Sequence, residues 1–218
     1  TQFGGDPGVR AIVLGGHGLF TWGETQQEAY LSSIKTIDQM GEFVQDHAKR
    51  AARPLFGGAS ATTAANRAAL VNGILPYLRG AVSSNRRVIA HYDGGEDAIA
   101  FANAQWADSL CQMGTSCPDH FLRTRICPLF VPAAPGEGVD TLRARIDDRL
   151  VQYRHAYAEY YRAHALPDSP ALRDANPSVV VIPAFGVFGF AKDKREARIT
   201  PEFFVKAMNV MSCGTDLD

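Results

Sequence analysis

The chain has 218 residues, of which 46% are hydrophobic and 21% are charged. This length and composition fit one globular domain, or two small ones, with a real core, and they exclude disorder as the main character. Lysine and arginine total 22 against 23 for aspartate and glutamate, so the net charge of −1 gives no sign of a nucleic-acid or membrane-surface binder. No apolar run approaches the roughly 20 residues that cross a bilayer. Four cysteines without a C-x-x-C pair predict a reduced, cytoplasmic protein.

Apolar runs and helical periodicity alternate along the chain. The predicted strands, in chain order, cover residues 10–14, 87–92, 126–131 and 178–182. The predicted helices cover residues 24–47, 62–84, 96–113, 140–163 and 194–211. The first strand is expected to be buried, Pro76 to kink or split its helix, and Asp140 to cap the long helix that follows it. Interleaved helices and strands indicate the α/β class.

Two segments 168 positions apart look alike. Residues 11–40 and 179–208 share six identities without a gap, and both predict a strand, a turn with glycine and aromatic residues, and then a helix. A duplication explains this, as do two ordinary strand–helix units that both need glycine at the turn. The difference that matters most is that His17 in the first segment corresponds to Phe185 in the second.

His17 stands between two glycines at the end of a predicted strand. Flanking glycines let the backbone approach a ligand closely, and histidine is the commonest metal ligand and a frequent acid or base near neutral pH. A histidine bonded to a backbone carbonyl would be the purely structural interpretation. A zinc site needs three or four protein ligands, so His17 would need partners.

A second candidate site lies in residues 115–125, T-S-C-P-D-H-F-L-R-T-R. This segment concentrates hydroxyls, an acid, an imidazole and two guanidiniums, and arginine binds phosphate and carboxylate through a planar fork. The candidate ligand-binding residues are Ser116, Asp119, His120, Arg123 and Arg125. Ser116 and Asp119 also fit a helix-capping pattern, which would give them a structural role instead.

Several motifs together resemble the class II aldolase/adducin family. L-G-G-H-G-L-F-T-W-G resembles its N-H-G-L segment. H-Y-D-G-G, G-T-S-C-P-D-H-F-L-R-T-R and F-G-V-F-G-F-A-K-D-K resemble the aldolase region of the bifunctional rhamnulose-1-phosphate aldolase/short-chain alcohol dehydrogenase subgroup. The resemblance covers about residues 10–213. It implies α/β/α layers and cleavage of a sugar 1-phosphate to dihydroxyacetone phosphate and an aldehyde.

The resemblance also implies a divalent metal, usually Zn²⁺, held by three histidines that chelates the substrate oxygens as a Lewis acid. His17 matches the third of these histidines, and Gly16 replaces the usual asparagine before it. In the family the other two ligands, in an H-x-H motif, and the acid/base glutamate precede this segment. The chain can therefore supply at most one of the three expected ligands, and no residue in it is assigned as the acid or base.

The same comparison predicts the domain organisation. Residues 1–50 would be the last strand and helix of an aldolase domain, and residues 51–213 a second, degenerate aldolase-like module. On this interpretation the chain is a fragment that is inactive alone, the full-length protein carries a dehydrogenase domain, and it is a homo-oligomer. The alternative is a non-catalytic interaction or assembly module, as in adducin-like relatives.

Overall fold

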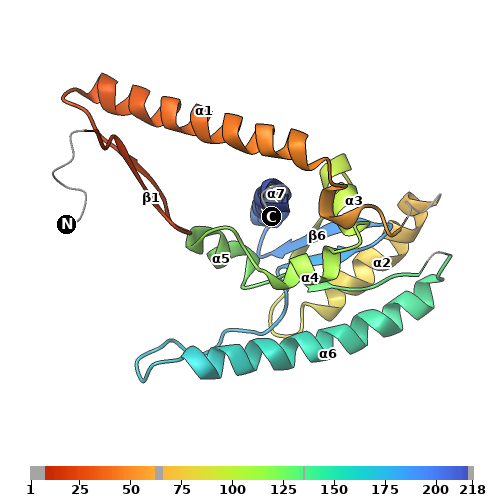
Figure 1. Cartoon of the computed structure of the whole chain (residues 1–218). Coiled ribbons are helices and arrows are strands. Elements are labelled where there is room, and N and C mark those ends of the chain that lie inside the picture. Colours follow the sequence, from red (N-terminus) through yellow and green to blue (C-terminus); the bar gives the residue numbers. More distant parts are fainter. Residues whose placement is uncertain (1–7, 62–65, 135, 216–218) are drawn as a thin grey trace.

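The computed structural model describes residues 8–61, 66–134 and 136–215 (Figure 1). The strands are β1 (Ala11–Leu14), β2 (Gly18–Thr21), β3 (Ile89–Asp93), β4 (Leu129–Phe130), β5 (Val179–Ile182) and β6 (Gly186–Ala191). The helices are α1 (Gln26–Ala51), the 3₁₀ turn η1 (Leu55–Gly57), α2 (Arg67–Ala81), α3 (Glu96–Ala102), α4 (Ala107–Gln112), α5 (Pro118–Thr124), α6 (Val139–His164) and α7 (Lys194–Thr215). The predicted α/β class is confirmed.

The main sheet has the strand order β3-β6-β5-β4. β6 is antiparallel to both β3 and β5, and β4 runs parallel to β5. All four residues of β5 are buried, which explains why this strand is a continuous run of β-branched residues without a polar position. The short central strands therefore have both faces covered.

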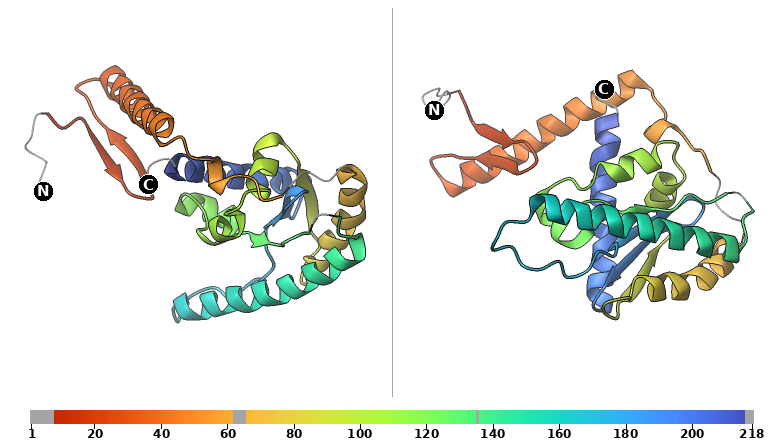
Figure 2. Two further views of the ribbon diagram at one scale, coloured as in Figure 1. Left: turned by 45° about the vertical axis from the view of Figure 1, so that its right-hand side comes forward. Right: turned by 90° about the horizontal axis from the view of Figure 1, so that it is seen from below.

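Helices cover both faces of this sheet (Figures 1 and 2). One face packs against α2 and α6 through side chains that include Ile74, Leu78, Leu142, Ile146 and Leu150. The other face packs against α3 and α7 through side chains that include Phe101, Phe204, Ala207 and Met208. Residues of β5 alternate between the two clusters, as the period of two in a strand requires.

The first unit of the chain, β1, β2 and α1, extends away from this body (Figure 2). β1 and β2 form a separate antiparallel hairpin, and α1 contacts that hairpin. The prediction that β1 is buried is wrong, because Ile12, Val13 and Leu14 are between 45% and 56% exposed. On α1, Ile34 and Ile37 share one face of the helix and are likewise exposed. The sequence thus has a core-type pattern here with no core to cover it among the described residues.

The two similar segments adopt the same hairpin–helix structure. Leu14 faces Gly18 in the first hairpin and Ile182 faces Gly186 in the second, and the other three pairs of β1 and β2 recur in β5 and β6 at the same offset of 168. α1 begins at Gln26 and α7 at Lys194, which keeps the offset. The likeness that the sequence predicted therefore extends to register and helix start. The second strand of each hairpin was not predicted, because its glycines and aromatic residues suggested a turn.

Three other predicted elements differ in detail. The helix expected at 96–113 is divided into α3 and α4, because backbone groups at 104–106 pair instead with residues 56–59. Pro76 does not split its helix, and the part of that prediction at 62–65 lies outside the described residues. Asp140 lies inside α6, whose N-cap is Gly138. Propensity alone does not register tertiary hydrogen bonds of this kind.

Candidate functional site

The tip of the first hairpin presents His17 to solvent. Its backbone N–H donates to the carbonyl of Leu14 at 3.0 Å and closes the turn. Gly16 has φ +68°, in the left-handed region that favours glycine. The tight turn therefore fixes the backbone while the imidazole remains available.

The equivalent turn of the second hairpin is built the same way and lined differently. Phe185 donates its N–H to Ile182 at 3.1 Å, and Ala184 has φ +68° although it is not glycine. The Asn103 side chain holds this turn by accepting from the Ala184 N–H at 2.6 Å, and the Tyr92 hydroxyl donates to the Phe185 carbonyl at 2.7 Å. Phe185 is 4% exposed and belongs to the core. This second turn is a packing element, with no imidazole to bind a ligand.

The second candidate segment forms the short helix α5 and the turns on both sides of it. The helix-capping interpretation of Ser116 and Asp119 is wrong: the N-cap is Cys117, and it makes no side-chain cap bond. Ser116 Oγ instead lies 3.1 Å from Nδ1 of His120, whose ring packs edge-on against Phe203 of α7. His120 is therefore held between a hydroxyl and an aromatic ring.

The two arginines of this segment are both engaged in ion pairs. Arg123 pairs with Glu196 at the start of α7. Arg125 Nη2 lies 2.8 Å from the Asp174 carboxylate, and Nη1 donates to the Tyr157 hydroxyl at 3.1 Å. Asp174 is 5% exposed, so this second pair is nearly removed from water. The arginines thus have structural partners and are not free to grip a ligand unaided.

The turn that holds His17 and the 115–125 segment line a common cavity. A cavity of about 400 Å³ is lined by Gly16 of the first turn together with the 115–118 segment, Phe121 and Tyr160. A larger one, of about 750 Å³, has Asp119, Arg123 and Arg125 among its lining residues. Phe121 lines both. Of the predicted residues, Ser116 lines the first cavity, and Asp119, Arg123 and Arg125 line the second. His120 is packed beside them.

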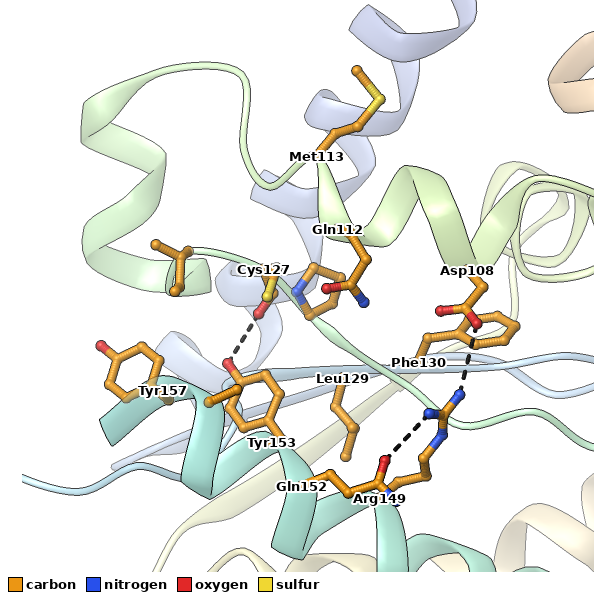
Figure 3. A pocket seen from close by; sticks show the side chains of 13 residues that line it. Asp108, Gln112, Met113, Cys127, Leu129, Phe130, Arg149, Gln152, Tyr153 and Tyr157 are labelled. Atoms are coloured by element: carbon orange, nitrogen blue, oxygen red, sulfur yellow. Dashed lines mark hydrogen bonds and ion pairs between the residues drawn. The ribbon is translucent and has the colours of Figure 1, made fainter. Parts of the chain in front are cut away.

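Figure 3 shows a further cavity, of about 540 Å³, that the sequence did not indicate. It lies between α4, the chain leading into β4, and α6, and its polar lining includes Asp108, Gln112, Arg149 and Gln152. Spacings of three and four residues place each pair on one helix face, but only the tertiary structure brings the two helices together.

The apolar end of this cavity carries a cysteine and a tyrosine. The Tyr153 hydroxyl donates to the Cys127 carbonyl at 2.9 Å (Figure 3). Burial raises the pKa of the Cys127 thiol, and burial likewise raises the pKa of Tyr153 far above its ordinary value. Both groups are therefore neutral at physiological pH and act as packing and hydrogen-bonding groups.

Within the described part of the chain, no group of three or more His, Cys, Asp and Glu side chains is arranged to hold a metal ion. His17 lies at an exposed turn, where it would be a single ligand. The described residues therefore do not fit a complete zinc centre of the kind that the resemblance implies.

Comparison with known proteins identifies the family. Residues 69–218 match the family described as "Aldolase class II, second domain". Because this match covers more than half of the chain, the chain belongs to the class II aldolase family. The fold around the main sheet is thus the second domain of a class II aldolase-type protein.

One curated relative is an uncharacterized oxidoreductase, YuxG, of Bacillus subtilis (strain 168). It is 28% identical over 215 residues, which is 97% of this chain and 31% of the relative. The chain therefore spans about a third of the length of this relative. No solved structure matches the chain. None of the described helices is long and apolar enough to cross a membrane.

Proposed function

We propose that this chain is part of a metal-dependent aldolase that cleaves a sugar 1-phosphate of the rhamnulose-1-phosphate type to dihydroxyacetone phosphate and an aldehyde. Membership of the class II aldolase family supports the reaction class. The segments G-T-S-C-P-D-H-F-L-R-T-R and F-G-V-F-G-F-A-K-D-K support the sugar. The name of the longer relative, an oxidoreductase, supports a dehydrogenase domain in the full-length protein.

One observation carries the proposal: two hairpins of identical register present different side chains at the same turn position. His17 is exposed, whereas its counterpart Phe185 is 4% exposed in the core. The buried phenylalanine has a structural role, because it packs in the core. The exposed imidazole on a fixed turn has no such packing role. Imidazole is suited to metal binding and to proton transfer near neutral pH. The chemistry therefore belongs to the first unit, and the second module is degenerate.

The strands that flank the second hairpin support the assignment of the first unit to an aldolase domain. There β6 pairs with β3 from Val187 to Ala191, and β5 pairs with β4 at Val180 and Val181. At the offset of 168, the residues that correspond to these paired positions are 19–23 and 12–13 of the first unit. Most of them are exposed and have no strand beside them among the described residues, apart from the hairpin itself. Two further strands at these edges would complete a layer like that of the second module. Residues 1–50 would then contribute one metal ligand to a site whose remaining ligands come from outside the chain.

An aldol-cleavage assay on the full-length protein tests this proposal. We expect His17→Ala to lower the cleavage rate at least about a hundredfold, since even groups that only support a metal ligand contribute 10- to 100-fold. His47→Ala is the matched control, because His47 is a partly exposed histidine of α1 whose Nδ1 lies 3.0 Å from the Phe43 carbonyl oxygen. Full activity in the His17→Ala protein would end the proposal.

The 218-residue chain alone provides a second test. It is expected to be inactive and to bind Zn²⁺ only weakly in calorimetry, because a single exposed imidazole is a poor zinc site. Sub-micromolar binding that is lost in His17→Ala would contradict the idea that the site is incomplete in this chain.

A second candidate function is a non-catalytic assembly module. The observation in its favour is the apolar surface of the first unit, where Phe20, Tyr30, Ile37 and Phe43 are all more than half exposed. Large exposed apolar patches mark interaction sites. This surface also agrees with the expected homo-oligomer. An unchanged cleavage rate in His17→Ala, combined with loss of assembly in Ile37→Glu on sedimentation, would favour this function over catalysis.

A further inference from the structure

The largest of the cavities described above, about 750 Å³, is rich in positive charge. It lies between α5, α6, the 171–173 loop, the end of β6 and the start of α7. Its basic lining residues are Arg86, Arg123, Arg125, Arg173 and Lys192. Its acidic lining residues are Asp119 and Glu196. This surplus of cations contrasts with the net charge of −1 of the whole chain, so the positive charge is concentrated here.

The five cations are not equivalent. Arg123 and Arg125 are neutralised by Glu196 and Asp174, as described above. Arg173 and Lys192 are exposed, and neither has a hydrogen bond or ion pair with another described residue. All N–H donors of these two side chains are therefore available to an anion. The two arginines of the 115–125 segment instead form ion pairs that join the elements around the cavity.

Arg86 is intermediate between these groups. Its Nε lies 3.6 Å from Asp174 Oδ2, and 44% of its side chain is exposed. That oxygen is buried without a hydrogen bond, so the ion pair is loose. Arg86 can therefore turn a second face of its guanidinium towards an anion while it keeps this contact.

The backbone beneath the cavity is strained at Arg125. This residue has φ +65° and ψ −171°, a conformation that side chains other than glycine rarely adopt. Its guanidinium is held there by Asp174 and by the ring of Tyr157, 5.0 Å from the ring centroid. Strain of this kind persists where the surrounding structure holds a residue in place, and it is common at ligand-binding sites. Here the residue that is held in place, Arg125, is part of the cavity lining.

The remaining walls are aromatic. They are formed by Phe121, Tyr157, Tyr161, Phe190 and Phe203. Cavities that bind small organic molecules combine such apolar walls with a few convergent polar groups, and a volume of several hundred Å³ is in their usual range. The cations and the rings thus suit a ligand with an anionic head and an organic body.

We infer that this cavity binds a small organic phosphate. The phosphate lies between Arg173, Lys192 and Arg86, and the organic body lies against the aromatic walls. A dianionic phosphate matches several cations better than a single carboxylate does, and its oxygens accept the charge-assisted bonds that arginine and lysine donate. The inference does not depend on the aldolase proposal, because it uses neither His17 nor a metal.

Calorimetric titration of the 218-residue chain tests the inference, with fructose 1-phosphate, adenosine monophosphate and inorganic phosphate as probes. We expect at least one organic phosphate to bind more tightly than inorganic phosphate. The double variant Arg173→Gln/Lys192→Gln should weaken that binding by about tenfold for each cation removed. The control Arg50→Gln/Lys206→Gln makes the same charge change at exposed positions outside the cavity lining and should bind normally.

Three results would overturn the inference: no binding of any probe at millimolar concentration, equal binding of organic and inorganic phosphate, or equal weakening in the control variant. Equal weakening would indicate a general charge effect, because both double variants remove two positive charges. Titration of His17→Ala separates the two proposals: unchanged binding there is expected, whereas loss would assign the phosphate to the His17 site and contradict a separate cavity.

Discussion

Removal of the Asp174 carboxylate should strongly destabilise the second module. In Asp174→Ala the guanidinium of Arg125, 17% exposed, loses its counter-charge at 2.8 Å, and the Asn176 N–H loses an acceptor at 3.0 Å. Breaking a buried ion pair by deleting one partner costs about 3–5 kcal/mol. The Tyr157 hydroxyl still accepts from Arg125, so we expect the lower end, about 3 kcal/mol. This is a large part of the 5–15 kcal/mol that a typical domain has.

Urea unfolding followed by circular dichroism measures this loss. Asp148→Ala is the control, because Asp148 is exposed on α6 and accepts a hydrogen bond from the Gln152 side chain there, so its removal should cost less than about 0.5 kcal/mol. The double variant Asp174→Ala/Arg125→Met should lose less than the sum of the two single variants, since no unpaired charge remains buried. A loss below about 1 kcal/mol in Asp174→Ala would refute the reasoning.

Three further predictions concern two glycines and the dependence of stability on pH. Gly189→Ala should destabilise the protein by several kcal/mol in the same urea assay, because the new Cβ would lie 2.3 Å from Cδ of Pro201. Gly41→Ala, in open space on α1, should instead stabilise that helix by about 0.5–1 kcal/mol, and a loss there would contradict the helix-propensity argument. Burial first, and then the ammonium of Lys194, lower the pKa of His91, so the unfolded chain binds a proton more readily than the folded one. The urea midpoint should therefore fall as the pH drops through about 6.5, and His91→Gln should reduce this fall; an identical pH profile in the variant would refute it.

The sequence indicated most of the helices and strands, whereas its two candidate sites, at His17 and in residues 115–125, stay predictions. Continuous β-branched runs such as 179–182 have an unambiguous period, and all four residues there are buried. It did not indicate β2 and β6, because glycines and aromatic residues in a strand look like a turn. It also gave no sign that Arg125 would pair with Asp174, 49 positions away, because such a pairing depends on how loops meet in space.

By itself, the sequence determined the α/β class, the likeness of the two hairpin–helix segments, and the difference between His17 and Phe185, because these depend on local periodicity and on residue type. Only the tertiary structure decided which copy is buried, which arginines are already paired, and where positive charge remains free. Burial and ion pairing depend on partners from distant parts of the chain. The two hairpins have the same register, yet their turns differ in burial because their neighbours differ. Phe185 of the second turn is buried in the core, and His17 of the first turn is exposed to solvent.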